Sequence, residues 1–238
     1  MQPLLNIIVY TSLAGFALAA GGALASIARL RPRWLEEEFR HGVLAFGGGV
    51  LLAAVALVLV PHGMRELSVA AAAASFIAGG VLFFVIDRSL TLAGHPASNL
   101  VAALLDFIPE AIALGALIST QPALGILLAF YIGLQNLAEG FNAYRELVAA
   151  AHATKQQAMI LMAGSALLGP LCGILGFYVL SDAPVATSVT MLSAAGGILY
   201  LIFQDIAPQA KLDRHWGPPL GAVFGFALGL LGTMLVQG

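Results

Sequence analysis

Eight long apolar segments, separated by short polar breaks, are the feature that most limits how this chain can fold. Hydrophobic residues make up 60% of the 238 residues and charged residues only 9%, whereas a soluble domain carries about 25% charged residues. A helix needs roughly 20 apolar residues to cross the hydrocarbon core of a bilayer. We therefore predict an all-α integral membrane protein that forms a single polytopic domain over residues 1–238. Its eight transmembrane helices are predicted at roughly 4–28, 42–61, 68–87, 99–118, 122–144, 158–180, 186–207 and 218–236.

The basic residues predict how these helices are oriented. Of the ten lysines and arginines, only Arg65 falls in a break on one side of the membrane. Basic residues concentrate in cytoplasmic loops, so both termini are predicted to be extracytoplasmic, in a multi-pass protein of a cell membrane, inner or plasma. No basic patch indicates binding to nucleic acid, and the predicted environment is the lipid bilayer. The nine residues on the predicted cytoplasmic side are Arg29, Arg31, Arg33, Arg40, Arg88, Arg145, Lys155, Lys211 and Arg214.

Three acidic residues lie well inside apolar segments. They are Asp106 and Glu110 in the fourth predicted span and Glu139 in the fifth. An unpaired carboxylate at membrane depth is costly, so such a residue pairs, takes up a proton or binds a cation. No lysine or arginine lies at that depth to pair with them, since Arg145 falls at the end of its span. The acids are therefore either protonated and hydrogen-bonded between helices, or they bind a metal ion.

The spacing of these residues favours a shared site. Asp106 and Glu110 are four residues apart and lie on one helix face, and Gln135 and Glu139 repeat that spacing in the next span. The two spans are predicted to form an antiparallel hairpin in which Asp106 and Gln135 are level. Pro109 is predicted to kink the fourth span and Gly140 to loosen the fifth. These breaks are expected to bring the four polar side chains onto one ion.

At these residues the sequence resembles the ZIP (Zrt/Irt-like) family of divalent metal transporters. The family's fourth and fifth spans carry motifs similar to His-Asn-x-Pro-Glu-Gly. Here the fourth reads Asp-Phe-Ile-Pro-Glu-Ala over residues 106–111, and the fifth reads Gln-Asn-Leu-Ala-Glu-Gly over 135–140. Residues 45–61 and 195–208 resemble the family's second and seventh spans. The resemblance implies eight spans with both termini outside, and it also implies a homodimer.

The departures from the family pattern bear on the number and kind of ions. Asp106 and Gln135 stand where histidines are usual, and Phe107 and Gly169 replace two ligands of a second ion. The resemblance therefore implies one metal site, formed by Asp106, Glu110, Gln135 and Glu139 with assistance from Asn136. Oxygen ligands favour Mn²⁺ or Fe²⁺, whereas imidazole suits Zn²⁺, although Zn²⁺ also accepts carboxylates.

The resemblance implies that the chain moves a divalent transition metal ion (Zn²⁺, Fe²⁺ or Mn²⁺) toward the cytoplasm. The ion is then a substrate, and we expect no further cofactor and no enzymatic activity. Gln204 and Asp205 fall where the family has polar residues on its exit path, although Asp205 is equally explained as a solvated acid at the end of a span. His62 follows Pro61 at the predicted outer mouth, where it captures ions or is an ordinary loop histidine.

Two other classes of function stay open at the level of sequence. One is an intramembrane hydrolase that uses paired carboxylates around an activated water or a catalytic metal, although no His-Glu-x-x-His motif is present. The other is a transport-inactive membrane scaffold derived from a transporter, which the replaced ligands suggest.

Overall fold

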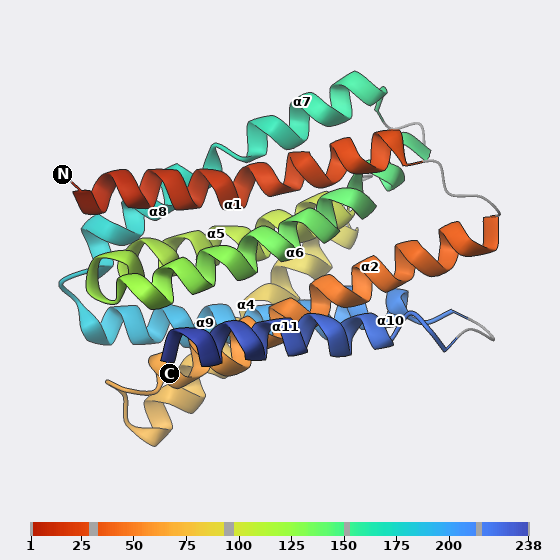
Figure 1. The fold of residues 1–238 in the computed structure, drawn as a ribbon. Coiled ribbons are helices and arrows are strands. Elements are labelled where there is room, and N and C mark those ends of the chain that lie inside the picture. The colour runs from red at the N-terminus through yellow and green to blue at the C-terminus, as the bar shows by residue number, and fades with distance from the viewer. Residues whose placement is uncertain (1, 29–32, 93–97, 150–152, 213–215, 238) are drawn as a thin grey trace.

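The fold is a bundle of helices that run roughly along a common direction, with the N- and C-termini at the same end (Figure 1). The computed structural model describes residues 2–28, 33–92, 98–149, 153–212 and 216–237. Within these ranges the α-helices are α1 (Gln2–Ile27), α2 (Arg33–Ala53), α3 (Val60–Gly63), α4 (Val69–Leu92), α5 (Ser98–Thr120), α6 (Pro122–Ala149), α7 (Lys155–Ser165), α8 (Leu168–Leu180), α9 (Pro184–Leu201), α10 (Ala207–Ala210) and α11 (Leu220–Gln237). Two π-helical segments, η1 (Ala54–Leu59) and η2 (Ile202–Ile206), complete the helical elements.

Within the residues that the structure describes, seven helical stretches are long and apolar enough to cross a membrane, which makes this a multi-pass membrane protein. They are Pro3–Ile27, Glu36–Gly63, Val69–Leu90, Ala103–Thr120, Pro122–Ala149, Lys155–Leu180 and Pro184–Ala210. Each coincides with one of the first seven predicted spans. The apolar part of α11, Leu220–Val236, is shorter than these seven, so the eighth span stays a prediction.

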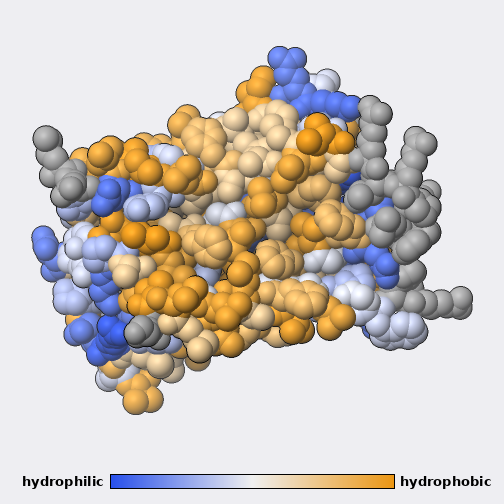
Figure 2. Space-filling view, in the orientation of Figure 1, coloured by the Kyte–Doolittle hydropathy of each residue, from blue (hydrophilic) through white to orange (hydrophobic). Residues whose placement is uncertain are grey.

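On the face seen in Figure 2, an apolar belt lies between two polar ends. Large hydrophobic side chains are exposed on this belt, among them Leu13 of α1, Ile77 of α4, Leu171 of α8 and Phe224 of α11. In water such a surface would be unfavourable, but in a bilayer it faces lipid of the same polarity.

Most of the basic residues lie at the end of the bundle opposite the termini. We call this the basic end, and the other the terminal end. The basic end carries Arg40, Arg88, Arg145, Lys155 and Lys211, all near the corresponding ends of their helices, whereas Arg65 follows α3 at the terminal end. Arg29, Arg31 and Arg214 lie outside the described residues. The distribution agrees with the asymmetry seen in the sequence, and the side of the membrane that each end faces stays a prediction.

Two spans change to a π-helix just before a proline. Pro61 and Pro208 have no N–H to donate to the carbonyl four residues earlier. The hydrogen-bond ladder shifts by one residue ahead of each, so that the Val60 N–H bonds to the Val55 carbonyl and the Ala207 N–H to the Ile202 carbonyl. Single π turns inside α-helices are frequent at functional sites. The second of these turns, η2, contains Asp205.

The sixth span is interrupted, unlike the continuous helix predicted over 158–180. Helix α7 ends at Ser165 and α8 begins at Leu168. Pro170 cannot donate a hydrogen bond to the Ala166 carbonyl. The N–H of Gly169 bonds to this carbonyl instead, at 3.2 Å, which accounts for the break.

Glycines allow four pairs of helices to approach backbone to backbone: α1 with α6, α2 with α11, α4 with α9, and α5 with α8. In a membrane the hydrophobic effect does not drive helices together, so association depends on close van der Waals packing. Small residues permit this close approach. In each pair, a Cβ on a glycine of one helix would overlap a carbonyl oxygen of the other. The four contacts join Gly140 to Leu18, Gly225 to Phe46, Gly196 to Phe76, and Gly176 to Ile112.

Gly140→Ala is expected to destabilise the protein by about 1–3 kcal/mol or more, because its methyl group would overlap the backbone of α1. The matched control is Gly164→Ala in α7, where an added Cβ meets nothing within 4 Å and alanine improves helix propensity by up to about 1 kcal/mol. Thermal unfolding in detergent measures both variants. Equal melting temperatures for the two would contradict the packing described for α1 and α6.

Candidate functional site

The predicted polar residues lie together in the middle of the bundle, on α5 and α6. Asp106 and Glu110 belong to α5, and Gln135, Asn136 and Glu139 to α6. All five are buried, and Glu110 and Gln135 are fully inaccessible to solvent. The two helices are joined by a tight turn at Gln121, so this hairpin holds both sets of polar side chains in one region of the membrane-spanning bundle.

The side chains pair across the hairpin in a register that differs from the predicted one. The Gln135 amide nitrogen donates to a Glu110 carboxylate oxygen at 2.8 Å, and Asp106 lines a cavity together with Glu139. Helix side chains lean toward the N-terminus of their own helix. In an antiparallel hairpin, the side chains of Glu110 and Gln135 therefore lean toward each other, and so do those of Asp106 and Glu139. Contacts consequently form between residues that are not level along the backbone.

Five buried oxygen atoms of these residues have no hydrogen-bond partner among the residues that the structure describes. A buried polar atom without a partner costs about 1–3 kcal/mol, and more if it is charged. Native proteins keep few such atoms, so a cluster of them needs a functional explanation. The five atoms are Asp106 Oδ1, Glu110 Oε1, Gln135 Oε1, Asn136 Oδ1 and Glu139 Oε2.

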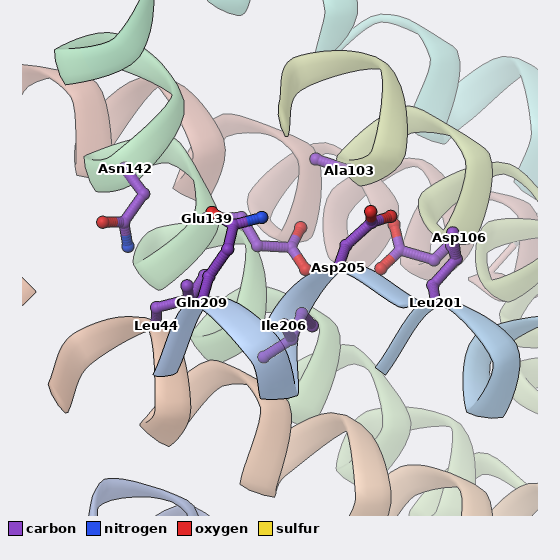
Figure 3. Close-up of a pocket in the computed structure, with 9 residues that line it drawn as sticks. All are labelled: Leu44, Ala103, Asp106, Glu139, Asn142, Leu201, Asp205, Ile206 and Gln209. Atoms are coloured by element: carbon purple, nitrogen blue, oxygen red, sulfur yellow. The ribbon is translucent and has the colours of Figure 1, made fainter. Parts of the chain in front are cut away.

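A small cavity of about 30 Å³ is lined by two of these five residues, Asp106 and Glu139. The carboxyl groups of Asp106, Glu139 and Asp205 are all directed into it (Figure 3). This volume exceeds the roughly 10–15 Å³ that one water needs, so the cavity can hold a water or a small ion. None of its nine lining residues is a lysine or an arginine, so no basic side chain in its wall offsets the three acids.

The two polar residues predicted near the end of the seventh span have different positions. Asp205 is half-buried and lines the cavity, whereas Gln204 is exposed and does not line it. The π turn η2 sets which face of the chain each of them occupies. Asp205 therefore belongs to the site and is not merely a solvated acid at the end of a span.

Asn142 and Gln209 also line the cavity, and the sequence analysis missed both. Asn142 lies three residues after Glu139, and Gln209 lies four after Asp205. Residues three or four apart share a helix face. Asn142 therefore lies on the same face as Glu139, and Gln209 on the same face as Asp205, so this spacing could have predicted both. The Asn142 amide nitrogen donates to the Ala138 carbonyl at 3.0 Å.

A larger vestibule of about 790 Å³ connects the cavity to the basic end. Leu44, Asn142 and Gln209 line both spaces. The vestibule is also lined by His41 and by three cationic side chains, those of Arg40, Arg145 and Lys211. Arg145 is held in place by an ion pair with Glu36 and by a hydrogen bond to the Ala28 carbonyl.

His62 lies at the terminal end, in α3, where it lines a separate space of about 420 Å³ with Arg65 and Gln121. It is buried in a helix and is not an ordinary loop residue. Its Nδ1 is 2.8 Å from the Val58 carbonyl oxygen. A carbonyl only accepts, so Nδ1 carries the proton and Nε2, which has no partner, keeps a free lone pair.

Among the described residues, the site cavity shares lining residues with the vestibule at the basic end. It shares no lining residue with the space around His62. Fully buried apolar side chains occupy the bundle on that side, among them Leu114 of α5, Leu128 and Ile132 of α6, and Val58 of η1. These buried apolar side chains lie in the part of the bundle between the cavity and the terminal end.

Asn136 faces α1, away from the cavity. Its amide nitrogen donates to the Ala14 carbonyl at 2.9 Å, and it does not line the cavity. The Phe107 ring lies near Gly15 of α1 and Gly169 of α8, where it would touch a Cβ built at either glycine. Phe107 thus fills the space between α1 and α8 with a buried apolar ring.

The chain matches no protein-family model, and a search of curated proteins found no match. Within the described residues, no three His, Cys, Asp or Glu side chains are close enough to form a ready-made metal site. The Gln135 oxygen is an additional donor beside the acids. The site is accordingly a buried cluster of carboxyl and amide oxygens around a small cavity, in a multi-pass membrane protein.

Proposed function

We propose that this chain carries a divalent transition metal ion across the membrane through the oxygen cluster on α5 and α6. The observation that carries this proposal is the set of five buried oxygens without partners. A divalent cation would satisfy several of these oxygens at once and offset the adjacent negative charges. In membrane proteins, buried acids that face the bundle interior mark ion pathways.

The kinds of atoms that would bind the ion favour some divalent ions over others. Asp106, Glu110 and Glu139 offer carboxylate oxygens, and the Gln135 oxygen is available because its nitrogen is already bonded to Glu110. No histidine or cysteine is among the residues that line the cavity. Such a set favours Mn²⁺ or Fe²⁺, while Zn²⁺ remains an acceptable ion.

The route we propose runs from the site to the basic end. An ion that leaves Glu110 and Gln135 would meet Asp106, Glu139 and Asp205 in the small cavity and would then enter the vestibule. If the basic end is cytoplasmic, as the positive-inside rule predicts, transport is directed inward. His62, with a free Nε2 lone pair at the terminal end, would receive ions from outside after a rearrangement opens that side.

The resemblance to the ZIP family supports the same function and adds further proposals. They are eight spans with both termini outside the cytoplasm, a homodimer, and residence in the inner or plasma membrane of the cell.

We expect one ion per chain. The ring of Phe107 fills the volume beside Gly169, and both residues stand where the family resemblance would put ligands of a second ion. The Asn136 nitrogen donates to the Ala14 carbonyl of α1. Equilibrium dialysis with Mn²⁺, followed by metal analysis, measures the stoichiometry. Two ions bound with similar affinity would contradict this assignment.

Uptake into proteoliposomes tests the proposed function. Purified protein is reconstituted, and entry of Zn²⁺, Mn²⁺ and Fe²⁺ is compared with entry into protein-free vesicles. We expect saturable uptake of at least one ion, with Mn²⁺ and Fe²⁺ competing strongly. If the protein binds these ions at the cluster but moves none of them, the scaffold function is favoured. Water-dependent cleavage of a membrane substrate that requires Glu110 would favour the hydrolase.

A further inference from the structure

An apolar groove on the outside of the bundle is distinct from the ion cavity. It has a volume of about 350 Å³ and lies between α2, the η2–α10 segment and α11. Small residues form much of its wall, including Gly48 and Gly49 of α2, Ala207 of α10 and Ala222 of α11. Every lining residue is apolar except Lys211.

The groove faces the hydrocarbon region of the bilayer. Its walls belong to the candidate spans Glu36–Gly63 and Pro184–Ala210, and Leu52 and Ala207 on its rim are exposed. Its small lining residues leave a narrow channel suited to a flexible hydrocarbon chain and not to another helix. The surrounding membrane supplies such chains.

Lys211 gives one end of the groove a positive charge. It lies just beyond α10 at the basic end and also lines the vestibule, together with Arg40. We propose that the groove binds an anionic phospholipid, with an acyl chain along the groove and the headgroup phosphate on Lys211. The charge complementarity favours an anionic headgroup over a zwitterionic one, because each basic residue near the surface attracts anionic lipid.

This lipid would lie against the wall of the ion site. Ile206 lines both the groove and the cavity that contains Asp205. The lipid phosphate would also reduce the positive charge at the vestibule. This positive charge otherwise opposes a cation that leaves the site toward the basic end. Lipid binding in the groove does not depend on the proposed transport. Only the effect of the lipid on the departing ion rests on the proposed function.

Native mass spectrometry of the full chain tests the proposal, with phosphatidylglycerol and phosphatidylcholine added in equal amounts. We expect the parent protein to retain phosphatidylglycerol about fivefold more than phosphatidylcholine, and Lys211→Gln to abolish that preference. The matched control is Lys155→Gln, because Lys155 is the only other lysine of the chain and lies at the basic end on α7. This control should keep the parent's preference.

Ala207→Phe provides a second variant that fills the groove and leaves Lys211 in place. It should lower retention of both lipids, with no loss of thermal stability, since Ala207 is exposed. Equal retention of the two lipids by the parent, or an equal loss in both lysine variants, would overturn the proposal. So would a lipid-free dimer that Ala207→Phe prevents, because the groove would then accommodate a second copy of the chain.

Discussion

Glu110→Gln and Glu139→Gln each lower the initial rate of ion uptake into proteoliposomes by about 100-fold or more. Each change removes one buried negative charge that the ion would otherwise neutralise, and loss of one partner of a buried charge pair costs about 3–5 kcal/mol. In Glu110→Gln, the oxygen of the introduced amide would still accept the hydrogen bond that Gln135 donates to Glu110 in the parent. The loss of uptake should therefore arise from removal of the carboxylate charge and not from misfolding.

The matched control for these variants is Glu66→Gln. Glu66 is an exposed residue between α3 and α4 at the terminal end, so this change also removes one glutamate charge but outside the bundle. We expect its uptake to stay within about twofold of the parent, since a single exposed charge contributes little. If all three variants transport alike, the α5–α6 cluster is not on the ion's path.

Glu139→Met is expected to stabilise the metal-free protein while it abolishes the stabilising effect of the ion. Glu139 Oε2 is buried without a partner among the described residues, and a buried acceptor left unsatisfied costs about 1–3 kcal/mol, a penalty that an apolar side chain avoids. This exceeds the roughly 0.5–1.5 kcal/mol that the side-chain hydrogen bond between Glu139 and Asp106 contributes. In the parent, an ion at 100 times its Kd adds about 2.7 kcal/mol. Thermal unfolding of both proteins with and without Mn²⁺ measures the two effects.

A loss of stability in Glu139→Met would mean that the Glu139 carboxyl has a structural role. If Glu139→Met melts earlier than the parent without metal, Glu139 has a stabilising partner in the folded protein. If Mn²⁺ stabilises Glu139→Met as much as the parent, the ion binds elsewhere. Asn142→Leu serves as a comparison, because Asn142 lines the same cavity but carries no charge.

The sequence predicted the spans well because a bilayer sets the length and polarity of a helix directly. It did not predict the break at Ala166 and Leu167, which arises because Pro170 has no N–H to donate to the Ala166 carbonyl and Gly169 donates to it instead. A kink was predicted at Pro109. In the structure, Pro109 lies inside α5, and the helix continues through it. Gly140 is likewise explained by its contact with α1 and not by loosening of α6.

The members of the candidate site could be predicted from their spacing, but their pairing could not. The i,i+4 pattern identifies which side chains share a face of α5 or α6. Which residues meet across the hairpin depends on the lean of the side chains, so Glu110 and not Asp106 bonds to Gln135. Asp205 joins the site through a π turn, and the basic vestibule combines three segments distant in sequence. The π turn has a local cause in Pro208, whereas the vestibule has no local sequence signal.

The most direct test of the central claim is the position of a bound Mn²⁺ ion, located by anomalous diffraction from crystals of the purified protein. The account predicts one strong peak between α5 and α6, with oxygens of Glu110, Glu139 and Gln135 as ligands, and no such peak in Glu110→Gln/Glu139→Gln. A peak that persists in the double variant, or one found only outside the membrane-spanning bundle, would contradict it.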